Sequence, residues 1–171
     1  MAPRRIVLVL SAALFLNATL FLTATLGVSA AEPSSIETQM LAAHNAVRER
    51  VGVRPLVWSN KLARAAQEWA DRLVKEGAFR HRPNSEWGQN LYEVGGSEFL
   101  PQQIVNGWDG EAKDYDLASN TCKEGRMCGH YTQMVWRETK EVGCAVARGG
   151  NREVWVCEYS PPGNYVGKRP Y

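Results

Sequence analysis

The stretch that decides the fold is residues 142–159, VGCAVARGGNREVWVCEY. Two runs rich in valine or aromatic residues flank Gly149-Gly150-Asn151, and this combination is typical of the turn of a β-hairpin. Cys144 and Cys157 lie at equal distances from the centre of the turn, so an antiparallel register places them opposite each other. The sequence therefore predicts a hairpin whose strands are joined by a Cys144–Cys157 disulfide.

Helical patterns precede this hairpin. Apolar residues recur at helical spacing from residue 36 to near Gly52, and again from Ser59, which can cap a helix, to Gly77, which can end it. Three shorter elements are predicted between the second helix and the hairpin: a strand at 88–94, a helical stretch from Ser97 to Glu111, and a short helix at 129–138. Because helices come first and an antiparallel sheet last, the expected class is α+β, with helices on both faces of the sheet.

Composition indicates one globular domain. The chain has 171 residues, 44% of them hydrophobic, with six Trp, six Tyr and four Phe, which disfavours disorder. Lys and Arg number 20 and Asp and Glu 18; two of the basic residues lie in the first 30, which hold no acid. The remainder is therefore balanced, which argues against a nucleic-acid partner, because such proteins rely on a basic surface.

The first 30 residues resemble a secretory signal peptide. Arg4 and Arg5 precede an apolar block at residues 6–16, and small residues end the segment at Val28-Ser29-Ala30. We expect cleavage there, an extracellular location (periplasm or cell surface in a bacterium), and a single domain at 31–171 with no membrane span. The alternative is a leader retained as an anchor, since the moderately apolar stretch is long enough to cross a bilayer.

Export makes disulfides the expected state of the four cysteines. With Cys144 and Cys157 paired, Cys122 and Cys128 are left to close a small loop. A structural zinc site is the alternative, and the spacings do not resemble its usual CxxC pattern.

Only three histidines occur, and imidazole is the usual protein ligand for zinc. His44 lies on the apolar stripe of the first helix, where a buried, hydrogen-bonded ring is the simpler interpretation. His81 lies in a polar turn after the second helix. His130 opens a helix directly after Cys128-Gly129, where a disulfide would fix its orientation. The chain has neither an HExxH nor a G-x-S-x-G motif.

Four stretches together resemble the CAP superfamily, which includes cysteine-rich secretory proteins, insect venom antigens and plant pathogenesis-related proteins. They are HNAVR (44–48), GQNLY (88–92), CGHYTQMVWR (128–137) and VWVCEYSPPGNYVGKRPY (154–171). The resemblance spans about residues 36–171 and is strongest to the plant pathogenesis-related branch and its microbial relatives. It implies a three-layer α-β-α sandwich with a central antiparallel sheet, and hydrogen-bonding structural roles for His44, Asn45 and Arg48.

The resemblance also implies a central cleft with two histidines and two acids. Carried across, these positions are His81, Gln89, Glu111 and His130, and Gln89 departs because most plant members have Glu there. A carboxamide cannot supply an anionic ligand or accept a proton, so the metal ligands expected are His81, Glu111 and His130. Zinc would bind weakly, with water in the fourth place, and would not be required. Glu86 is a candidate replacement for the missing acid.

Three functions are compatible with this resemblance. The favoured one is a non-enzymatic secreted monomer that binds a sterol or fatty acid in defence or host–microbe contact. Its apolar surface is sought around the third helix, at Phe99, Leu100, Ile104, Trp108 and Tyr131. The alternatives are a metal-dependent hydrolase and a precursor of a C-terminal signalling peptide, residues 161–171, although a packed tail is the simpler interpretation of that segment. The resemblance also indicates a lost disulfide, with one cysteine missing near residues 74–79 and its partner near 148–151.

Overall fold

The computed structural model describes residues 35–96 and 98–171. The leader expected at residues 1–30 lies outside the described residues, and its cleavage stays a prediction. Within the described part of the chain, no helix is both long and apolar enough to cross a membrane.

A four-stranded sheet forms the middle layer, in the order β1-β5-β6-β2. The strands are β1 (Val57–Trp58), β2 (Gly88–Gly95), β5 (Glu141–Gly149) and β6 (Arg152–Ser160). The predicted hairpin is confirmed, because β5 and β6 pair antiparallel with Cys144 opposite Cys157. Strand β2 continues the antiparallel pattern on β6, whereas the two-residue β1 pairs with β5 in parallel. Both predicted disulfides, Cys144–Cys157 and Cys122–Cys128, are present.

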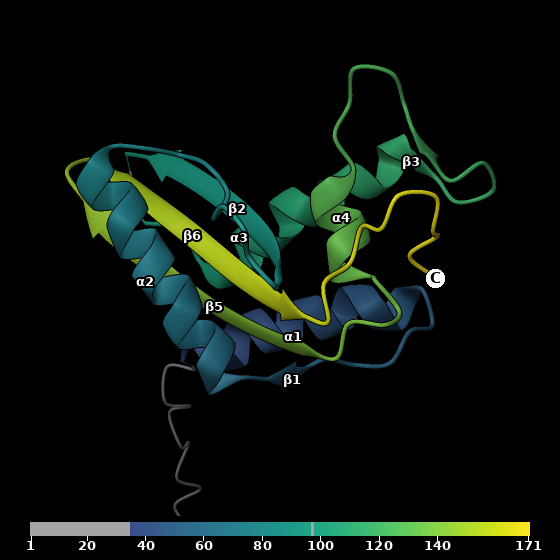
Figure 1. Ribbon diagram of the computed structural model, residues 1–171, viewed down its shortest axis with the longest axis horizontal. Coiled ribbons are helices and arrows are strands. Elements are labelled where there is room, and N and C mark those ends of the chain that lie inside the picture. The colour runs from purple at the N-terminus through teal and green to yellow at the C-terminus, as the bar shows by residue number, and fades with distance from the viewer. Residues whose placement is uncertain (1–34, 97) are drawn as a thin grey trace, which may run out of the picture. The chain divides into compact units, whose positions relative to one another are not determined.

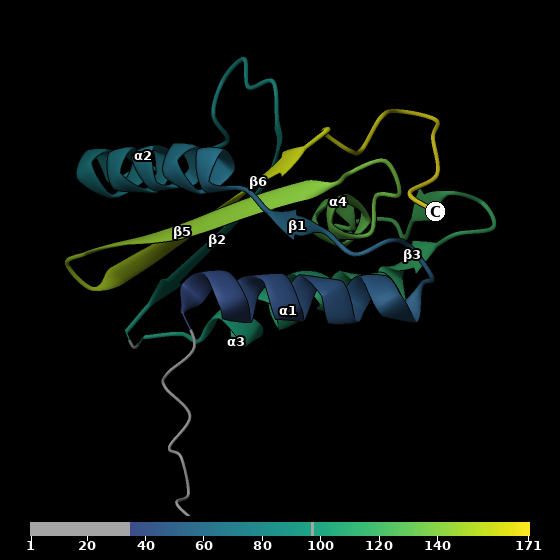
Figure 2. The ribbon, with the colours of Figure 1, turned by 90° about the horizontal axis from the view of Figure 1, so that it is seen from below.

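Helices cover both faces of this sheet, as the sequence predicts (Figure 1 and Figure 2). Helix α2 (Asn60–Glu76) packs on one face, where its apolar side meets alternate residues of β5 and β6, such as Ala145 and Val156. Helices α1 (Ile36–Arg50), α3 (Pro101–Asp109) and α4 (Gly129–Met134) share the opposite apolar cluster with the other alternate residues, such as Trp155 and Tyr159. This α-β-α arrangement follows from the two-residue period of a strand, which sends successive side chains to opposite faces.

The ends of the first two helices confirm the predicted stop at Gly77 but not the predicted side-chain cap at Ser59. The Ser35 hydroxyl accepts a hydrogen bond from the Thr38 N–H (3.2 Å) at the start of α1. Gly77 ends α2 in the left-handed conformation, with a φ of 62°. Ser59 does precede α2 but makes no side-chain cap; its N–H donates to the Val142 carbonyl instead (2.9 Å).

The third helical stretch is shorter than predicted. Helix α3 ends at Asp109, and Glu111 belongs to a following 3₁₀ helix, η1 (Gly110–Asp114). Glycine weakens a helix, which accounts for the change at Gly110. A second glycine of this stretch, Gly107, allows α3 to approach β2 closely, since a Cβ there would meet the Tyr92 ring at 2.5 Å. A small ladder, β3 (Tyr115–Asp116) with β4 (Thr121–Cys122), follows η1, and α4 is four residues shorter than the predicted 129–138.

The HNAVR motif ties α1 to the rest of the domain. The buried Arg48 guanidinium donates to four backbone carbonyls, those of Arg54, Met134, Trp136 and Thr139. Asn45 forms a two-way pair with the Leu56 backbone, at 3.1 and 2.7 Å. His44 bonds the Met40 carbonyl and the Tyr159 hydroxyl, and burial lowers its pKa to about 4. The three residues therefore hold the helix, the α4–β5 loop and β6 together.

The C-terminal tail packs on α4 and the residues that follow it. The Arg137 N–H donates to the Pro170 carbonyl (2.6 Å), the Tyr131 and Tyr171 hydroxyls lie 2.9 Å apart, and the Gly163 N–H donates to the Gln133 side chain (2.9 Å). The simpler expectation is a tail packed back over the sheet; the tail is packed, but its partners are α4 and the following loop. Release of residues 161–171 would require these contacts to break.

An apolar contact occupies the region where the resemblance indicates a lost disulfide. A Cβ at Gly149 would overlap the Val74 side chain, so strand and helix approach closely there. The Arg152 guanidinium adds a hydrogen bond to the Ala78 carbonyl (2.9 Å). Packing therefore joins the end of α2 to the hairpin.

Candidate functional site

His130 is held by Glu111. Its ring Nδ1 lies 2.6 Å from Glu111 Oε1, while Glu111 Oε2 accepts hydrogen bonds from the backbone N–H groups of His130 (3.0 Å) and Tyr131 (3.2 Å). One carboxylate thus accepts hydrogen bonds from two free backbone N–H groups at the start of α4 and also orients the His130 ring. Within the described residues, ring Nε2 has no hydrogen-bond partner.

Neighbouring elements fix the same ring from other directions. The His130 imidazole stacks on Trp108, with centroids 6.2 Å apart and planes 20° from parallel. Trp108 is buried, and its indole N–H donates to the Leu91 carbonyl of β2 (3.1 Å). Asn90, the preceding residue of β2, donates to the His130 carbonyl (3.0 Å). His130 is therefore positioned by α3, η1 and β2 together.

His81 lies in an exposed loop after α2 and is held by Gln89. Its Nδ1 is 3.0 Å from Gln89 Oε1, which also accepts the Arg82 backbone N–H (3.0 Å), and Gln89 Nε2 donates to Glu158 Oε1 (2.8 Å). An amide oxygen only accepts, so the neutral His81 ring carries its proton on Nδ1 and its lone pair on Nε2. This ring, too, has no partner for Nε2 among the described residues.

Glu158 is a buried acid that the sequence analysis did not select. Its side chain is fully buried, its Oε2 has no hydrogen-bond partner among the described residues, and the Arg82 Nε lies 3.8 Å from Oε1. Burial raises the pKa of Glu158 to about 7, against the opposing effects of the Gln89 hydrogen bond and the Arg82 charge. The strand sequence VWVCEY carries a signal for it, since an acid inside a run of buried residues needs a polar partner.

Glu86, the candidate replacement for the acid missing at position 89, is not bonded to the His81–Gln89 pair. It is exposed, and it makes no hydrogen bond or ion pair with the other described residues. The acid next to Gln89 is Glu158, directly opposite it in the β2–β6 register.

Neighbouring residues of β2 contact the two histidine pairs, Gln89 the His81 ring and Asn90 the His130 carbonyl. Gln89 and Glu158 lie on the face of the sheet that α2 covers, because Leu91 and Val156, two residues along each strand, pack in the α2 cluster. Asn90 lies on the other face, with the His130 pair. Among the described residues, His44, Cys144 and Cys157 are the one group of three potential ligands whose atoms all lie within 4.8 Å of one another, and its cysteines are disulfide-bonded. His81, Glu111 and His130 are therefore more widely spaced than a closed metal site.

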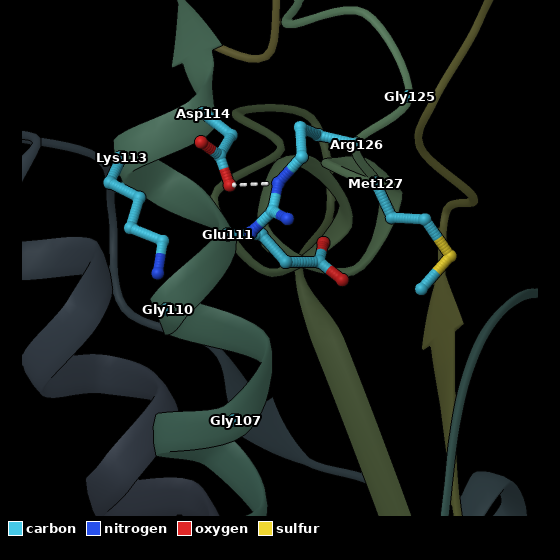
Figure 3. A pocket seen from close by; sticks show the side chains of 8 residues that line it. All are labelled: Gly107, Gly110, Glu111, Lys113, Asp114, Gly125, Arg126 and Met127. Atoms are coloured by element: carbon cyan, nitrogen blue, oxygen red, sulfur yellow. Dashed lines mark hydrogen bonds and ion pairs between the residues drawn. The ribbon is translucent and has the colours of Figure 1, made fainter.

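A pocket of about 370 Å³ opens beside Glu111 (Figure 3). Asp114 and Arg126, which both line it, pair through a 3.0 Å hydrogen bond. The Arg126 and Lys123 side chains hold the pKa of Asp114 below its usual range. The wall of this pocket thus contains a paired acid and base, Asp114 and Arg126, next to the residue that orients His130.

The GQNL, GHYTQMVW and CEYSPPGNY segments each contribute a contact around the two imidazoles. The HNAVR segment acts one step further away, because His44 lies against Trp108, which stacks on His130. Residues 41–159 match the CAP family, described as the cysteine-rich secretory protein family. The chain belongs to the CAP family. The three-layer sandwich expected from the resemblance is therefore confirmed.

Plant members of the CAP family are similar to this chain over most of its length. Pathogenesis-related protein PR-1 of Medicago truncatula is 42% identical over 139 residues, which cover 80% of each chain. Pathogenesis-related protein 1A of Nicotiana tabacum is 43% identical over 132 residues, 77% of this chain and 78% of that protein. Both relatives are named as pathogenesis-related proteins.

Solved CAP structures share the fold. The structure described as "Crystal structure of NaASP2 with Zn2+" has a TM-score of 0.67 and 27% identity, and the match covers 81% of this chain and 86% of that chain. The structure of Na-ASP-1 has a TM-score of 0.68 at 22% identity, over 81% of this chain and 41% of that chain. The first description shows that a CAP protein has been crystallised with zinc.

Proposed function

We propose that this chain is a secreted, non-enzymatic CAP protein of the pathogenesis-related kind, which acts in defence or host–microbe contact by binding a sterol or fatty acid. The observation that carries the non-enzymatic part is the state of Glu111. Both of its oxygens accept hydrogen bonds from the His130 ring and from the start of α4, so it is engaged as a structural acceptor. A general base needs an oxygen that faces substrate or water.

The apolar surface that supports ligand binding lies along α1. Three of the residues expected to form it, Ile104, Trp108 and Tyr131, are buried in the core, and only Leu100 is largely exposed. A groove of about 560 Å³ lies instead on the outer side of α1 and the loop after it. Its lining includes Ala42, Ala46, Val53 and Pro55. Small side chains there leave room for an acyl chain or a sterol ring, which burial of apolar surface would stabilise.

A binding assay with tritiated cholesterol and palmitate tests the proposal. We expect saturable binding to the purified protein. Ala46→Arg, which places a charge in the groove, should weaken it at least about tenfold. Ala118→Arg is the matched control, because Ala118 is also exposed but lies in the β3–β4 loop. No binding of either lipid, or equal binding by both variants, contradicts the proposed ligand site.

A metal-binding role is favoured by the two imidazoles. Both rings have Nδ1 fixed by an acceptor and Nε2 free of hydrogen bonds within the described residues, which is the usual arrangement of histidine ligands. Two neutral imidazole nitrogens are donors of the chemical type that suits a divalent metal. Glu111 then orients His130, where the sequence predicts a third ligand. Zinc bound here would supply a Lewis acid, while the protein holds the two rings.

Zinc titration by calorimetry, combined with a protease assay, tests this second role. We expect weak zinc binding that His81→Ala and His130→Ala each reduce at least about tenfold. Casein hydrolysis should stay at the level of buffer, with or without zinc. Zinc-dependent hydrolysis that His130→Ala abolishes would instead favour the metal-dependent hydrolase.

A further inference from the structure

Gln89 and Glu158 form a single hydrogen-bonded unit behind His81. They lie directly opposite each other on β2 and β6, with Gln89 Nε2 2.8 Å from Glu158 Oε1. The amide orientation has no alternative, because its other end accepts the Arg82 backbone N–H while the carboxylate accepts from its NH₂ group. The oxygen of Gln89 must therefore face His81.

This orientation sets the tautomer of His81. With an acceptor 3.0 Å from Nδ1, the neutral ring holds its proton on Nδ1 and presents a lone pair on Nε2. His130 reaches the same state differently, since a carboxylate accepts directly from its Nδ1. In the His81 pair, the acid is Glu158 on β6, which contacts Gln89 and not the histidine itself, and it is fully buried.

We propose that Glu158 is a positioning residue for His81: its carboxylate anchors the Gln89 amide, and that amide holds the proton of the neutral His81 ring on Nδ1, which leaves the Nε2 lone pair available to a ligand. At position 89 of β2, where the resemblance leads us to expect an acid, this chain has an amide, and the acid is at the facing position, Glu158 of β6. The pair carries a single acid, so its two members can exchange places but cannot both be carboxylates. The inference concerns the ligand-free protein and does not depend on the proposed lipid or metal.

The tautomer of His81 is the first test. Long-range ¹H–¹⁵N NMR of the ligand-free protein at mildly alkaline pH should show an Nδ1–H pattern for both His81 and His130. In Glu158→Leu, the acceptor behind Gln89 is absent, and the two His81 nitrogens should shift toward the averaged values of an exposed histidine. Glu158→Gln retains an acceptor oxygen and should restore the wild-type pattern.

His130 is the internal control, because Glu111 holds it in every variant. An unchanged His81 pattern in a folded Glu158→Leu protein, with the His130 pattern intact, would overturn the proposal. The control also separates this result from failure of the proposed function, because neither lipid nor zinc is present.

Charge exchange is the second test, and it remains informative if Glu158→Leu does not fold. Gln89→Glu places two carboxylates opposite each other and should lower the urea midpoint at neutral pH. Adding Glu158→Gln restores one acid and one amide, so the double variant should recover most of the loss and keep the Nδ1–H pattern of His81. If Gln89→Glu alone is as stable as the double variant, the two positions do not share one acid and the proposal is wrong.

Discussion

The two histidine pairs differ in how firmly the fold holds them. Around His130, Glu111 makes three hydrogen bonds, Trp108 stacks on the ring and Asn90 binds the backbone. Around His81, an exposed loop is held by the amide of Gln89, and the acid stands behind it. One histidine ring is thus packed against α3 and η1 at the start of α4, whereas the other is held by one side-chain hydrogen bond from the edge strand β2.

The largest effect is expected from Glu111→Ala. This change removes one hydrogen bond to the His130 ring and two to backbone N–H groups at the start of α4. We expect a loss of about 3 kcal/mol in the free energy of unfolding, because bonds to a charged acceptor are among the stronger ones. Urea denaturation followed by tryptophan fluorescence measures it.

Lys113→Ala is the control for this variant. Lys113 belongs to the same 3₁₀ helix, but its side chain is exposed and makes no hydrogen bond within the described residues. Its replacement should change stability by less than about 0.5 kcal/mol. Equal effects of the two variants would show that Glu111 does not hold α4.

The second effect is a pH dependence that originates in the His81 pair. Burial raises the pKa of Glu158 to about 7 in the folded protein, from 4.5. The folded state therefore binds this proton more tightly, and the stabilising contribution is lost as pH rises from about 4.5 to about 7. His44 has the opposite sign, because its folded pKa of about 4 makes stability increase with pH up to 6.5.

Comparison of Glu158→Gln with the wild type isolates the glutamate. The difference in unfolding free energy between the two proteins should change by about 2 kcal/mol across this range, in favour of the variant at higher pH. The His44 contribution cancels in the comparison. Parallel pH profiles of the two proteins would mean that Glu158 does not titrate with a raised pKa.

The sequence predicts best where the decisive contacts are local. The glycine-rich turn fixes the β5–β6 register and thereby one disulfide, and Gly77 ends α2 as expected. The role of Glu158 escapes such reasoning, because its partner Gln89 is 69 residues away and meets it only after β2 adds to β6. Glu111 was selected by resemblance as a ligand, yet its function as the acceptor for α4 depends on the 3₁₀ helix that replaces the expected last turn of α3.

The third effect compares the two histidines directly. His130→Ala removes a stacked ring that is only 23% exposed, together with its bond to Glu111, and should cost about 1.5 kcal/mol. His81→Ala alters an exposed loop and should change stability by less than about 0.5 kcal/mol. Urea midpoints of the two variants provide the measurement. A loss at His81 as large as that at His130 would refute the asymmetry between the two pairs.

The smallest effect should follow removal of metal. A structural zinc ion contributes roughly 10 kcal/mol or more to a domain that depends on it, so a chelator would unfold such a domain. Here two disulfides and two apolar clusters hold the fold, and neither His81 nor His130 belongs to those clusters. EDTA should therefore shift Tm by less than about 2 °C, while zinc at a hundredfold excess over Kd should stabilise the protein by about 2.7 kcal/mol.

His81→Ala should abolish the zinc effect and leave the EDTA result unchanged, because the loop histidine can bind metal without supporting the core. A large loss of Tm with EDTA would place the metal in the folding of the domain and remove the distinction between the two pairs.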